Sequence, residues 1–346
     1  MAVSARPLPP LLFLLLSLAG SACGPPEDAE RFQVEPSAER LGYFLESYEA
    51  SRAHFRHLIS DLAETRPELA GGIIAVPSAY DKDLSIDWAY LPSEGKDDAL
   101  LILTCGTHGV EAFATCAVLR HFMAEVAPEV EKEKVGLLLI HSLNPWGFKH
   151  SRRVTEQNVD LNRNFALDES LYDQENKGYQ ALDPLLNPRE PVRVGSLGHR
   201  LFTVRAMAKI LRHGMATLRQ AALQGQYEFA EGMYFGGEAL EPQADLIAPL
   251  FREKAESYET VVMIDLHTGY GERGTLHLFP ITPEDEGVRA ATEAFFSGYR
   301  IDWGDEEDFY QATGGFSTWV GSLLPPETVF VPDRSPPHLP NRCGSH

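Results

Sequence analysis

The chain has 346 residues, of which 44% are hydrophobic, and a formal net charge of −20 at pH 7. This length and composition can supply a full hydrophobic core for one large α/β domain or two ordinary ones, and they exclude a mainly disordered chain. The negative charge argues against nucleic acid or an anionic lipid surface as a partner, because phosphate groups would be repelled.

The N-terminal segment is typical of an export signal followed by a tether. Arg6 is the only charged side chain in residues 1–23, an apolar run covers residues 11–19, and small residues lead up to Cys23. The ending Gly-Ser-Ala-Cys resembles the lipobox of bacterial lipoproteins, in which Cys23 is lipidated; ordinary cleavage nearby is the alternative. Residues 24–37, rich in Pro and Glu, would form the tether. We expect an exported, periplasmic or cell-envelope lipoprotein that meets the membrane only through a lipid anchor.

The other cysteines, Cys105, Cys116 and Cys343, contain no CxxC pair. This spacing indicates neither a disulfide framework nor a zinc site with sulfur ligands. We therefore expect Cys105 and Cys116 to be small residues of the core.

Apolar runs alternate with helical stretches along the chain. The predicted strands cover residues 71–76, 84–90, 99–105, 135–140, 261–266 and 275–279, and the predicted helices cover residues 38–69, 111–126, 197–225 and 242–257. Several strands are apolar throughout, which is typical of strands buried in a parallel or mixed sheet. The pattern predicts an α/β fold, with an insertion at 168–196 that could wall a cleft.

A histidine and a glutamate stand three residues apart where the strand at 99–105 gives way to a helix. Residues 99–113 read ALLILTCGTHGVEAF. The glycines around His108 supply a turn that lifts it out of the sheet edge, and Glu111 falls in the first helical turn. Zinc hydrolases hold two of their metal ligands in this kind of setting.

A second strand ends in the same way. Residues 261–269 read VVMIDLHTG, so His267 follows a buried strand and precedes a glycine turn. Because ligands bind beyond the carboxyl ends of strands in such sheets, His267 offers a third ligand beside His108 and Glu111. Two histidines and one glutamate leave a zinc coordination position open for water, as in a hydrolytic rather than a structural site.

Two further residues near these strand ends have more modest roles. Asp265 lies on the same side of its strand as His267 and would support that histidine or orient nearby arginines. His141 also follows a strand, but it has no acidic neighbour at a ligand spacing. We expect His141 to be a hydrogen-bonded core residue.

A basic segment follows the strand at 135–140. Residues 144–165 read NPWGFKHSRRVTEQNVDLNRNF and include Arg152, Arg153 and the pair Asn162-Arg163. Guanidinium groups are planar, bidentate donors that grip a carboxylate. A solvated basic loop is the alternative interpretation, which the neighbouring metal motif disfavours.

These segments resemble the zinc carboxypeptidase superfamily, which also contains the aspartoacylase and succinylglutamate desuccinylase enzymes. Within it they are most similar to a bacterial branch known as a domain of unknown function. The resemblance rests on His-x-x-Glu at 108–111, the NPxGF and DLNRNF segments and the DLHTG strand end, all in the family's order. It implies a single domain over residues 38–331, with a mixed, twisted, mainly parallel sheet flanked by helices.

For the metal, the resemblance implies one zinc ion per chain, held by His108, Glu111 and His267. Zinc would lower the pKa of its water, a glutamate would take the proton and deliver it to the leaving amine, and an arginine would stabilise the oxyanion. The implied protein is an exported metallocarboxypeptidase-type hydrolase of amide bonds.

For the substrate, the resemblance implies a small peptide or acyl-amino acid with a free carboxylate, and no nucleic acid. The corresponding residues are Asn162 and Arg163 for the carboxylate, Arg153 (or Arg152) for the scissile carbonyl, and Tyr310 as the mobile substrate-binding tyrosine. Two alternatives stay open, namely an N-acyl amino acid deacylase and a catalytically inactive zinc- or peptide-binding lipoprotein.

The C-terminal part departs from the family pattern. Family members supply the general base from a late strand, commonly in a Glu-Phe-Gly-Thr context, which this sequence lacks. Glu327 is the default candidate for that base. Residues 332–346 are rich in Pro, Arg and His without apolar periodicity, so we expect an irregular tail from a truncated or frame-shifted end. A site without its base would bind metal and catalyse poorly or not at all.

Overall fold

The computed structural model describes residues 37–95, 99–189, 193, 195–269, 277–279, 286–303 and 312–333. The predicted export signal with Cys23, most of the predicted tether, Tyr310 and residues 334–346 lie outside the described residues. Among the helices of the described part, not one combines the length and the apolar character needed to cross a bilayer.

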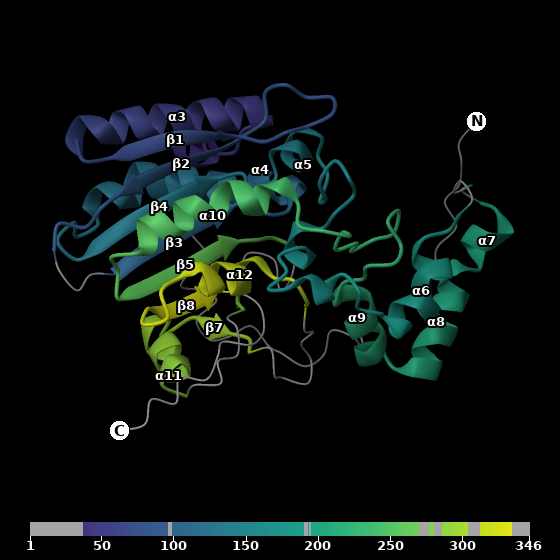
Figure 1. The fold of residues 1–346 in the computed structure, drawn as a ribbon. Coiled ribbons are helices and arrows are strands. Elements are labelled where there is room, and N and C mark those ends of the chain that lie inside the picture. The colour runs from purple at the N-terminus through teal and green to yellow at the C-terminus, as the bar shows by residue number, and fades with distance from the viewer. Residues whose placement is uncertain are drawn as a thin grey trace, which may run out of the picture.

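A six-stranded sheet forms the centre of the fold (Figure 1), in the spatial order β1-β2-β4-β3-β5-β8. Its strands are β1 (Ala70–Ala75), β2 (Ser85–Leu91), β3 (Ala99–Cys105), β4 (Val135–His141), β5 (Thr260–Leu266) and β8 (Val329–Asp333). β2 pairs antiparallel with β1 and β4, whereas β4, β3, β5 and β8 are parallel to one another. The expected mixed, mainly parallel sheet is confirmed. A separate small sheet joins β6 (His277–Leu278) to β7 (Arg300–Ile301).

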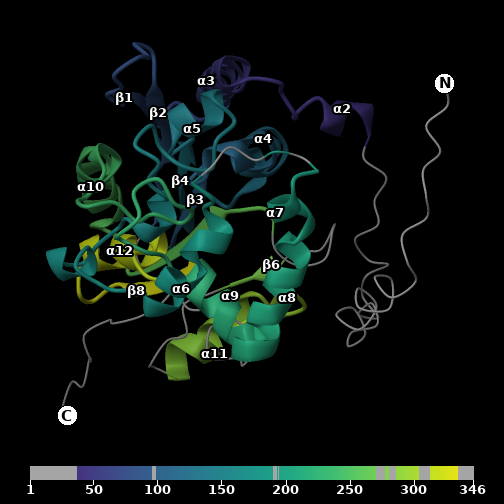
Figure 2. The ribbon, with the colours of Figure 1, turned by 90° about the vertical axis from the view of Figure 1, so that its right-hand side faces the viewer.

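Helices cover both faces of the large sheet. They are α2 (Ala38–Leu41), α3 (Tyr48–Thr65), α4 (Ala112–His121), α5 (Pro145–Lys149), α6 (Lys177–Leu186), α7 (Leu197–Arg200), α8 (Phe202–His213), α9 (Met215–Leu223), α10 (Pro242–Ala255), α11 (Glu286–Phe295) and α12 (Phe316–Leu323). Figure 2 shows α10 and α12 on one side of the sheet and α3 and α4 on the other. Successive side chains of β5 point to opposite faces of the sheet, as they do in any strand. Val261 and Met263 belong to the main core, whereas Val262 packs with Phe296 in a second cluster.

Two predicted helices are broken in the structure. The predicted helix at 38–69 is α2 and α3, and α3 begins after Ser47, whose side chain caps it by accepting from the Ala50 N–H at 3.1 Å. The predicted helix at 197–225 is α7, α8 and α9. Gly214 separates α8 from α9 with a φ of +80°, a left-handed conformation that interrupts a helix.

We predicted an irregular tail from residue 332, but the last strand continues to Asp333. Pro332 and Asp333 complete β8, where Pro332 is the register partner of Met263. Within the described residues β8 lies at the edge of the sheet, and an edge strand tolerates a proline because a missing N–H there costs no ladder hydrogen bond on the open side. The proline and the short length hid this strand from the sequence pattern.

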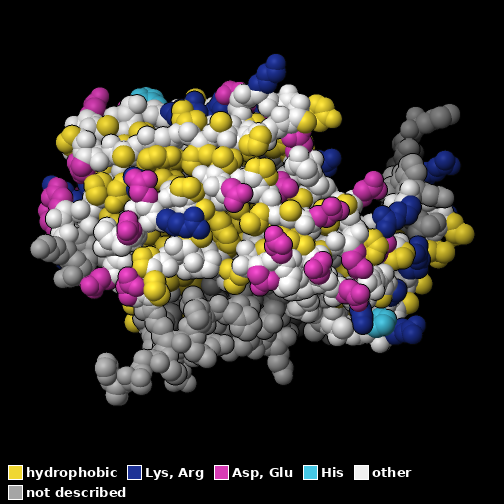
Figure 3. Space-filling model, viewed as in Figure 1, with side chains coloured by type: hydrophobic (Ala, Val, Ile, Leu, Met, Phe, Trp, Pro, Cys, Tyr) yellow, Lys and Arg dark blue, Asp and Glu magenta, His cyan; other side chains and the backbone are white. Residues whose placement is uncertain are grey.

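A group of helices lies beyond the carboxyl ends of β3 and β5. Figure 1 shows α6 to α9 there, so the insertion expected at 168–196 contributes a helix, α6, to this group. Figure 3 shows Lys and Arg side chains over the end that carries α8, with Asp and Glu spread over the rest of this face. The carboxyl edge of the parallel strands is thus bordered by a helical wall.

Candidate metal centre

The three predicted ligands meet at the carboxyl edge of the sheet. His108 lies three residues after β3, Glu111 ends the 3-10 turn η2 (Gly109–Glu111), and His267 directly follows β5. One potential ligand atom from each lies within 4.8 Å of the other two. The side chains of His108, Glu111 and His267 are 1%, 9% and 8% exposed, so the cluster is shielded from bulk water.

Backbone contacts fix the turn that carries Glu111. The N–H groups of Gly109 and Val110 donate to the carbonyl oxygens of Arg153 and Arg152 at 3.2 and 2.8 Å. A Cβ at position 109 would lie 2.1 Å from the carbonyl carbon of Gly147 in α5, so only glycine fits there. The ligand turn is therefore packed directly against the basic segment that the sequence placed near it.

A carboxylate lies within hydrogen-bond distance of Nε2 in each candidate ligand histidine. Nε2 of His108 lies 3.1 Å from Oδ1 of Asp160, and Nε2 of His267 lies 2.6 Å from Oδ2 of Asp265. Thr104 donates to Asp265 at 2.7 Å and fixes that carboxylate in turn. Such contacts select the tautomer that leaves Nδ1 available as a ligand.

The Nδ1 atoms of both histidines lie beside the Glu111 carboxylate. Nδ1 of His108 lies 2.8 Å from Oε1 of Glu111, and Nδ1 of His267 lies 3.1 Å from Oε2. Burial alone would raise the pKa of Glu111, but the two histidines outweigh it and hold this pKa below its ordinary value. Glu111 is therefore ionised, as a metal ligand must be.

Arg153 brings a positive charge to the same group. Its Nε donates to Oδ2 of Asp160 at 2.9 Å and its Nη1 to Oε1 of Glu111 at 3.2 Å. Burial opposes the charge of Arg153, but these two carboxylates raise its pKa above the ordinary value. Of the two arginines that the sequence offered for the scissile carbonyl, Arg153 faces the cluster, whereas Arg152 is exposed.

The donor set fits zinc. Two imidazole nitrogens and a carboxylate are borderline and hard ligands that zinc takes in three-ligand sites. The Nδ1 atoms of His108 and His267 lie only 3.1 Å apart, so at least one of them presents a lone pair toward the other rather than a proton. Converging lone pairs beside an ionised Glu111 suit a divalent cation.

We predict that Asp265→Asn weakens zinc binding by roughly 10- to 100-fold, because an amide orients and polarises His267 less well than a carboxylate. Competition with a chelator of known zinc affinity measures this change. Asp302→Asn is the matched control, since Asp302 holds His277 at 3.0 Å in the same way outside this cluster. An unchanged zinc affinity in Asp265→Asn would contradict the supporting role.

Asn162 and Arg163 are buried in the 3-10 turn η5 (Leu161–Arg163). Oδ1 of Asn162 accepts from the Phe316 N–H at 3.0 Å. Nε and Nη2 of Arg163 donate to the Leu223 carbonyl at 2.9 and 2.6 Å, and Nη1 donates to the Asn162 carbonyl at 2.7 Å. In this structure the fork of Arg163 is thus directed at backbone oxygens.

Tyr234 is a neighbour of this site that the sequence interpretation missed. The guanidinium carbons of Arg153 and Arg163 lie 5.4 and 6.0 Å from the centre of its ring, within the range of cation–π contacts. Its φ is +57°, a left-handed conformation that costs free energy in a tyrosine. The two glycines at 236 and 237 indicate a turn, but no local pattern joins Tyr234 to arginines more than seventy residues earlier.

Asp160 was also missed as a functional residue, although it opens the DLNRNF segment. It is fully buried, and the charges of Arg153 and His108 outweigh burial and hold its pKa well below the ordinary range. The available signal was its position in the sequence, because an acidic residue precedes Asn162 and Arg163 there.

His141 is a buried residue of the core. Its Nε2 lies 2.8 Å from Oγ of Ser51, which confirms the prediction of a hydrogen-bonded core histidine.

Glu327 does not reach the metal centre, and its assignment as general base is corrected. It lies two residues before β8, which begins beside Thr260, the first residue of β5. His267 follows the other end of β5, and at ~3.3 Å per residue the strand separates the two by roughly 20 Å. The sequence pattern did not predict β8, so it could not show that Glu327 and His267 lie at opposite ends of β5.

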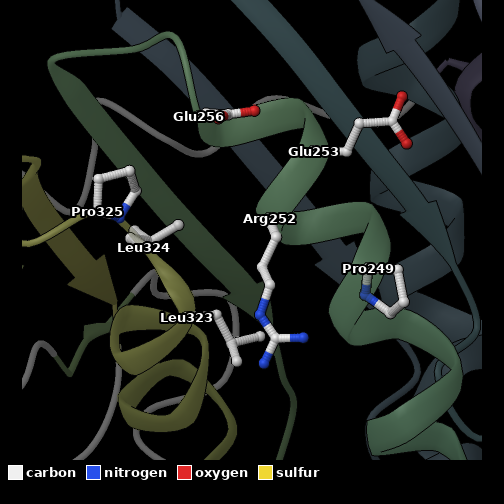
Figure 4. Close-up of a pocket in the computed structure, with 7 residues that line it drawn as sticks. All are labelled: Pro249, Arg252, Glu253, Glu256, Leu323, Leu324 and Pro325. Carbon is white, nitrogen blue, oxygen red and sulfur yellow. The ribbon is translucent and has the colours of Figure 1, made fainter.

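The described part of the chain also has a surface hollow. It has a volume of about 490 Å³ and lies between α10 and the end of α12 (Figure 4), lined by Pro249, Arg252, Glu253, Glu256, Leu323, Leu324 and Pro325. None of these residues is a candidate ligand. The hollow is thus separate from the chemistry of the carboxyl edge.

The fold and the cluster together define an α/β protein with a candidate metal centre of two histidines and a glutamate. The chain belongs to the family described as "Protein of unknown function (DUF2817)", whose family model matches residues 44–331. This confirms the branch expected from the motifs. None of the curated proteins matches the chain.

Several solved structures are similar to the chain at low sequence identity. Carboxypeptidase A from Helicoverpa armigera is 14% identical with a TM-score of 0.46, covering 94% of this chain and 71% of that one. An aspartoacylase family protein from Mesorhizobium loti is 16% identical with a TM-score of 0.37, covering 76% and 60%. A succinylglutamate desuccinylase from Silicibacter sp. TM1040 is 15% identical with a TM-score of 0.36, covering 76% and 58%. None of these likenesses assigns an activity to this chain.

Proposed function

We propose that this protein is a zinc-dependent hydrolase of amide bonds in substrates that carry a free carboxylate. The observation that supports it is the convergence of His108, Glu111 and His267 within 4.8 Å at the carboxyl edge of parallel strands, with Arg153 bonded to Glu111 at 3.2 Å. Three protein ligands leave zinc an open position, which distinguishes hydrolytic from structural sites.

When bound, zinc would supply a Lewis acid and an acidified water molecule. The chain supplies the rest. Asp160 and Asp265 keep the ligand histidines oriented, and Arg153 is a fixed cation beside the cluster that can stabilise negative charge on a substrate oxygen. Because Arg153 is already held by two carboxylates, little reorganisation is needed when that charge develops.

Two panels of substrates test the activity. Purified protein with added zinc is incubated with C-terminal dipeptides and with N-acyl amino acids, and release of the free amino acid is measured. Slow hydrolysis in either panel, lost on chelation and restored by zinc, is expected, because Glu327 is not at the centre to act as its general base. The preferred panel separates a carboxypeptidase from a deacylase. Zinc binding without hydrolysis of either panel would overturn the proposal in favour of a binding protein.

We further propose that Arg163, with Asn162 beside it, binds the substrate carboxylate after its guanidinium group turns away from the Leu223 carbonyl that it contacts in this structure. We predict that Arg163→Met weakens binding of free-carboxylate ligands much more than binding of their amides, because only the carboxylate loses a charge-assisted, bidentate contact. Titrations with matched acid and amide ligands measure the difference. Equal losses for both would contradict this role and leave Arg163 as a support for the Leu223 carbonyl.

A further inference from the structure

Two cysteines lie in contact next to the metal centre. Cys105 is the last residue of β3 and Cys116 lies in α4, and both are fully buried, as the sequence predicted for core residues. Their Sγ atoms are 2.7 Å apart, although the residues are 11 positions apart in the chain. The segment between them contains the ligands His108 and Glu111.

We propose that Cys105 and Cys116 form a disulfide bond in the oxidised protein. A disulfide has an S–S distance of about 2.05 Å, so bond formation needs a closure of roughly 0.7 Å from the observed contact. Non-bonded carbon atoms pack at ~3.5 to 4.0 Å, so the two sulfurs are already much closer than ordinary packing requires.

The surroundings of the pair favour reaction at Cys116. Burial opposes ionisation of Cys116, but the Cys105 thiol, His141 and the charge of Arg120 outweigh it and lower the pKa of Cys116. Burial and contact with Cys116 instead raise the pKa of Cys105. Arg120 is itself buried and anchored, since it donates to the Ser51 hydroxyl and to the Tyr43 carbonyl. The pair therefore contains a thiolate former and a resolving thiol.

The oxidant would be a disulfide, such as oxidised glutathione. The Cys116 thiolate attacks one glutathione sulfur, the glutathione S–S bond breaks, and one glutathione leaves as a thiolate. The Cys105 thiol then gives up its proton, its sulfur attacks the Cys116 sulfur, and the second glutathione leaves. Two protein thiols thus lose two electrons and two protons, and one glutathione disulfide is reduced to two thiols.

Because both sulfurs are inaccessible in the folded chain, exchange takes place while the chain folds or when α4 opens. The bond would close a covalent loop of residues 105–116, which contains His108 and Glu111. It would hold the middle of α4 against the end of β3, the two elements whose connection carries these candidate ligands.

Peptide mapping of the full-length chain tests the bond. The chain is refolded in glutathione redox buffer or in dithiothreitol, and is then denatured with iodoacetamide and digested with trypsin. Residues 97–120 contain no internal Lys or Arg, so both cysteines fall on one tryptic peptide. We expect this peptide to be unalkylated and lighter by two hydrogen atoms after oxidative refolding, and doubly alkylated after refolding in dithiothreitol.

Thermal unfolding gives a second readout. We expect the Tm of the oxidised chain to exceed that of the reduced chain by roughly 5 °C. The difference should persist in Cys343→Ser and vanish in a Cys105→Ala, Cys116→Ala double variant. Double alkylation of peptide 97–120 after oxidative refolding, or a bond from either cysteine to Cys343, would overturn the proposal. The mapping of the unmodified chain decides the question even if the double variant does not fold.

Discussion

Replacing His108 and His267 together by alanine is expected to reduce bound zinc from about one ion per chain to nearly none. The two imidazoles supply two of the three protein ligands, and Glu111 alone cannot hold zinc against competing water. Metal analysis of purified protein after dialysis measures the loss, and hydrolytic activity should disappear with it. Each single variant should lose most of its zinc as well.

His57→Ala is the matched control for this experiment. His57 lies on α3 with a side chain that is 70% exposed, and its contact is with Asp61. Its replacement should leave the zinc content and the activity unchanged. Full zinc occupancy in the His108→Ala, His267→Ala double variant would show that the metal binds elsewhere.

Arg153→Met is expected to lower kcat by roughly 10²- to 10³-fold while most of the zinc stays bound, because it removes the cation that stabilises the developing oxyanion. Steady-state kinetics on the preferred substrate, together with metal analysis, separates this effect from loss of the metal. Arg153→Lys should recover part of the rate, since a point charge remains without the planar fork.

Arg152→Met provides the comparison, because Arg152 is the exposed neighbour and touches the ligand turn only through its carbonyl. It should keep the unmodified rate. An equal loss of zinc and of activity in Arg153→Met would contradict a role in the reaction. It would instead show that Arg153 serves to neutralise Glu111 and Asp160.

The central strands and the convergence of the three candidate ligands could be predicted because their signals are local. β3 and β5 are short apolar runs, and each is followed within three residues by a histidine at the turn. In a parallel sheet neighbouring strands end at the same edge, so two such strand ends are sufficient to bring His108 and His267 together. The register of β3 with β5, which pairs Cys105 with Leu266, agrees with that expectation.

The rest of the site depends on contacts between distant segments. Tyr234 reaches Arg153 and Arg163 through a loop with a left-handed residue, which no periodicity marks. Glu327 was chosen for its residue type alone. Its distance from the centre follows from the direction of β8, a strand that the proline at 332 concealed from a pattern based on apolar alternation.

Pro332 also affects whether another strand can pair with the edge of the sheet at β8. An open strand edge offers unpaired N–H groups to which another polypeptide can add, and this is a common route to aggregation. In the described part of the chain β8 is one edge of the sheet, and Pro332, the fourth of its five residues, has no N–H to donate. A strand added along β8 would find no N–H donor at Pro332, which makes this edge a poorer template for pairing.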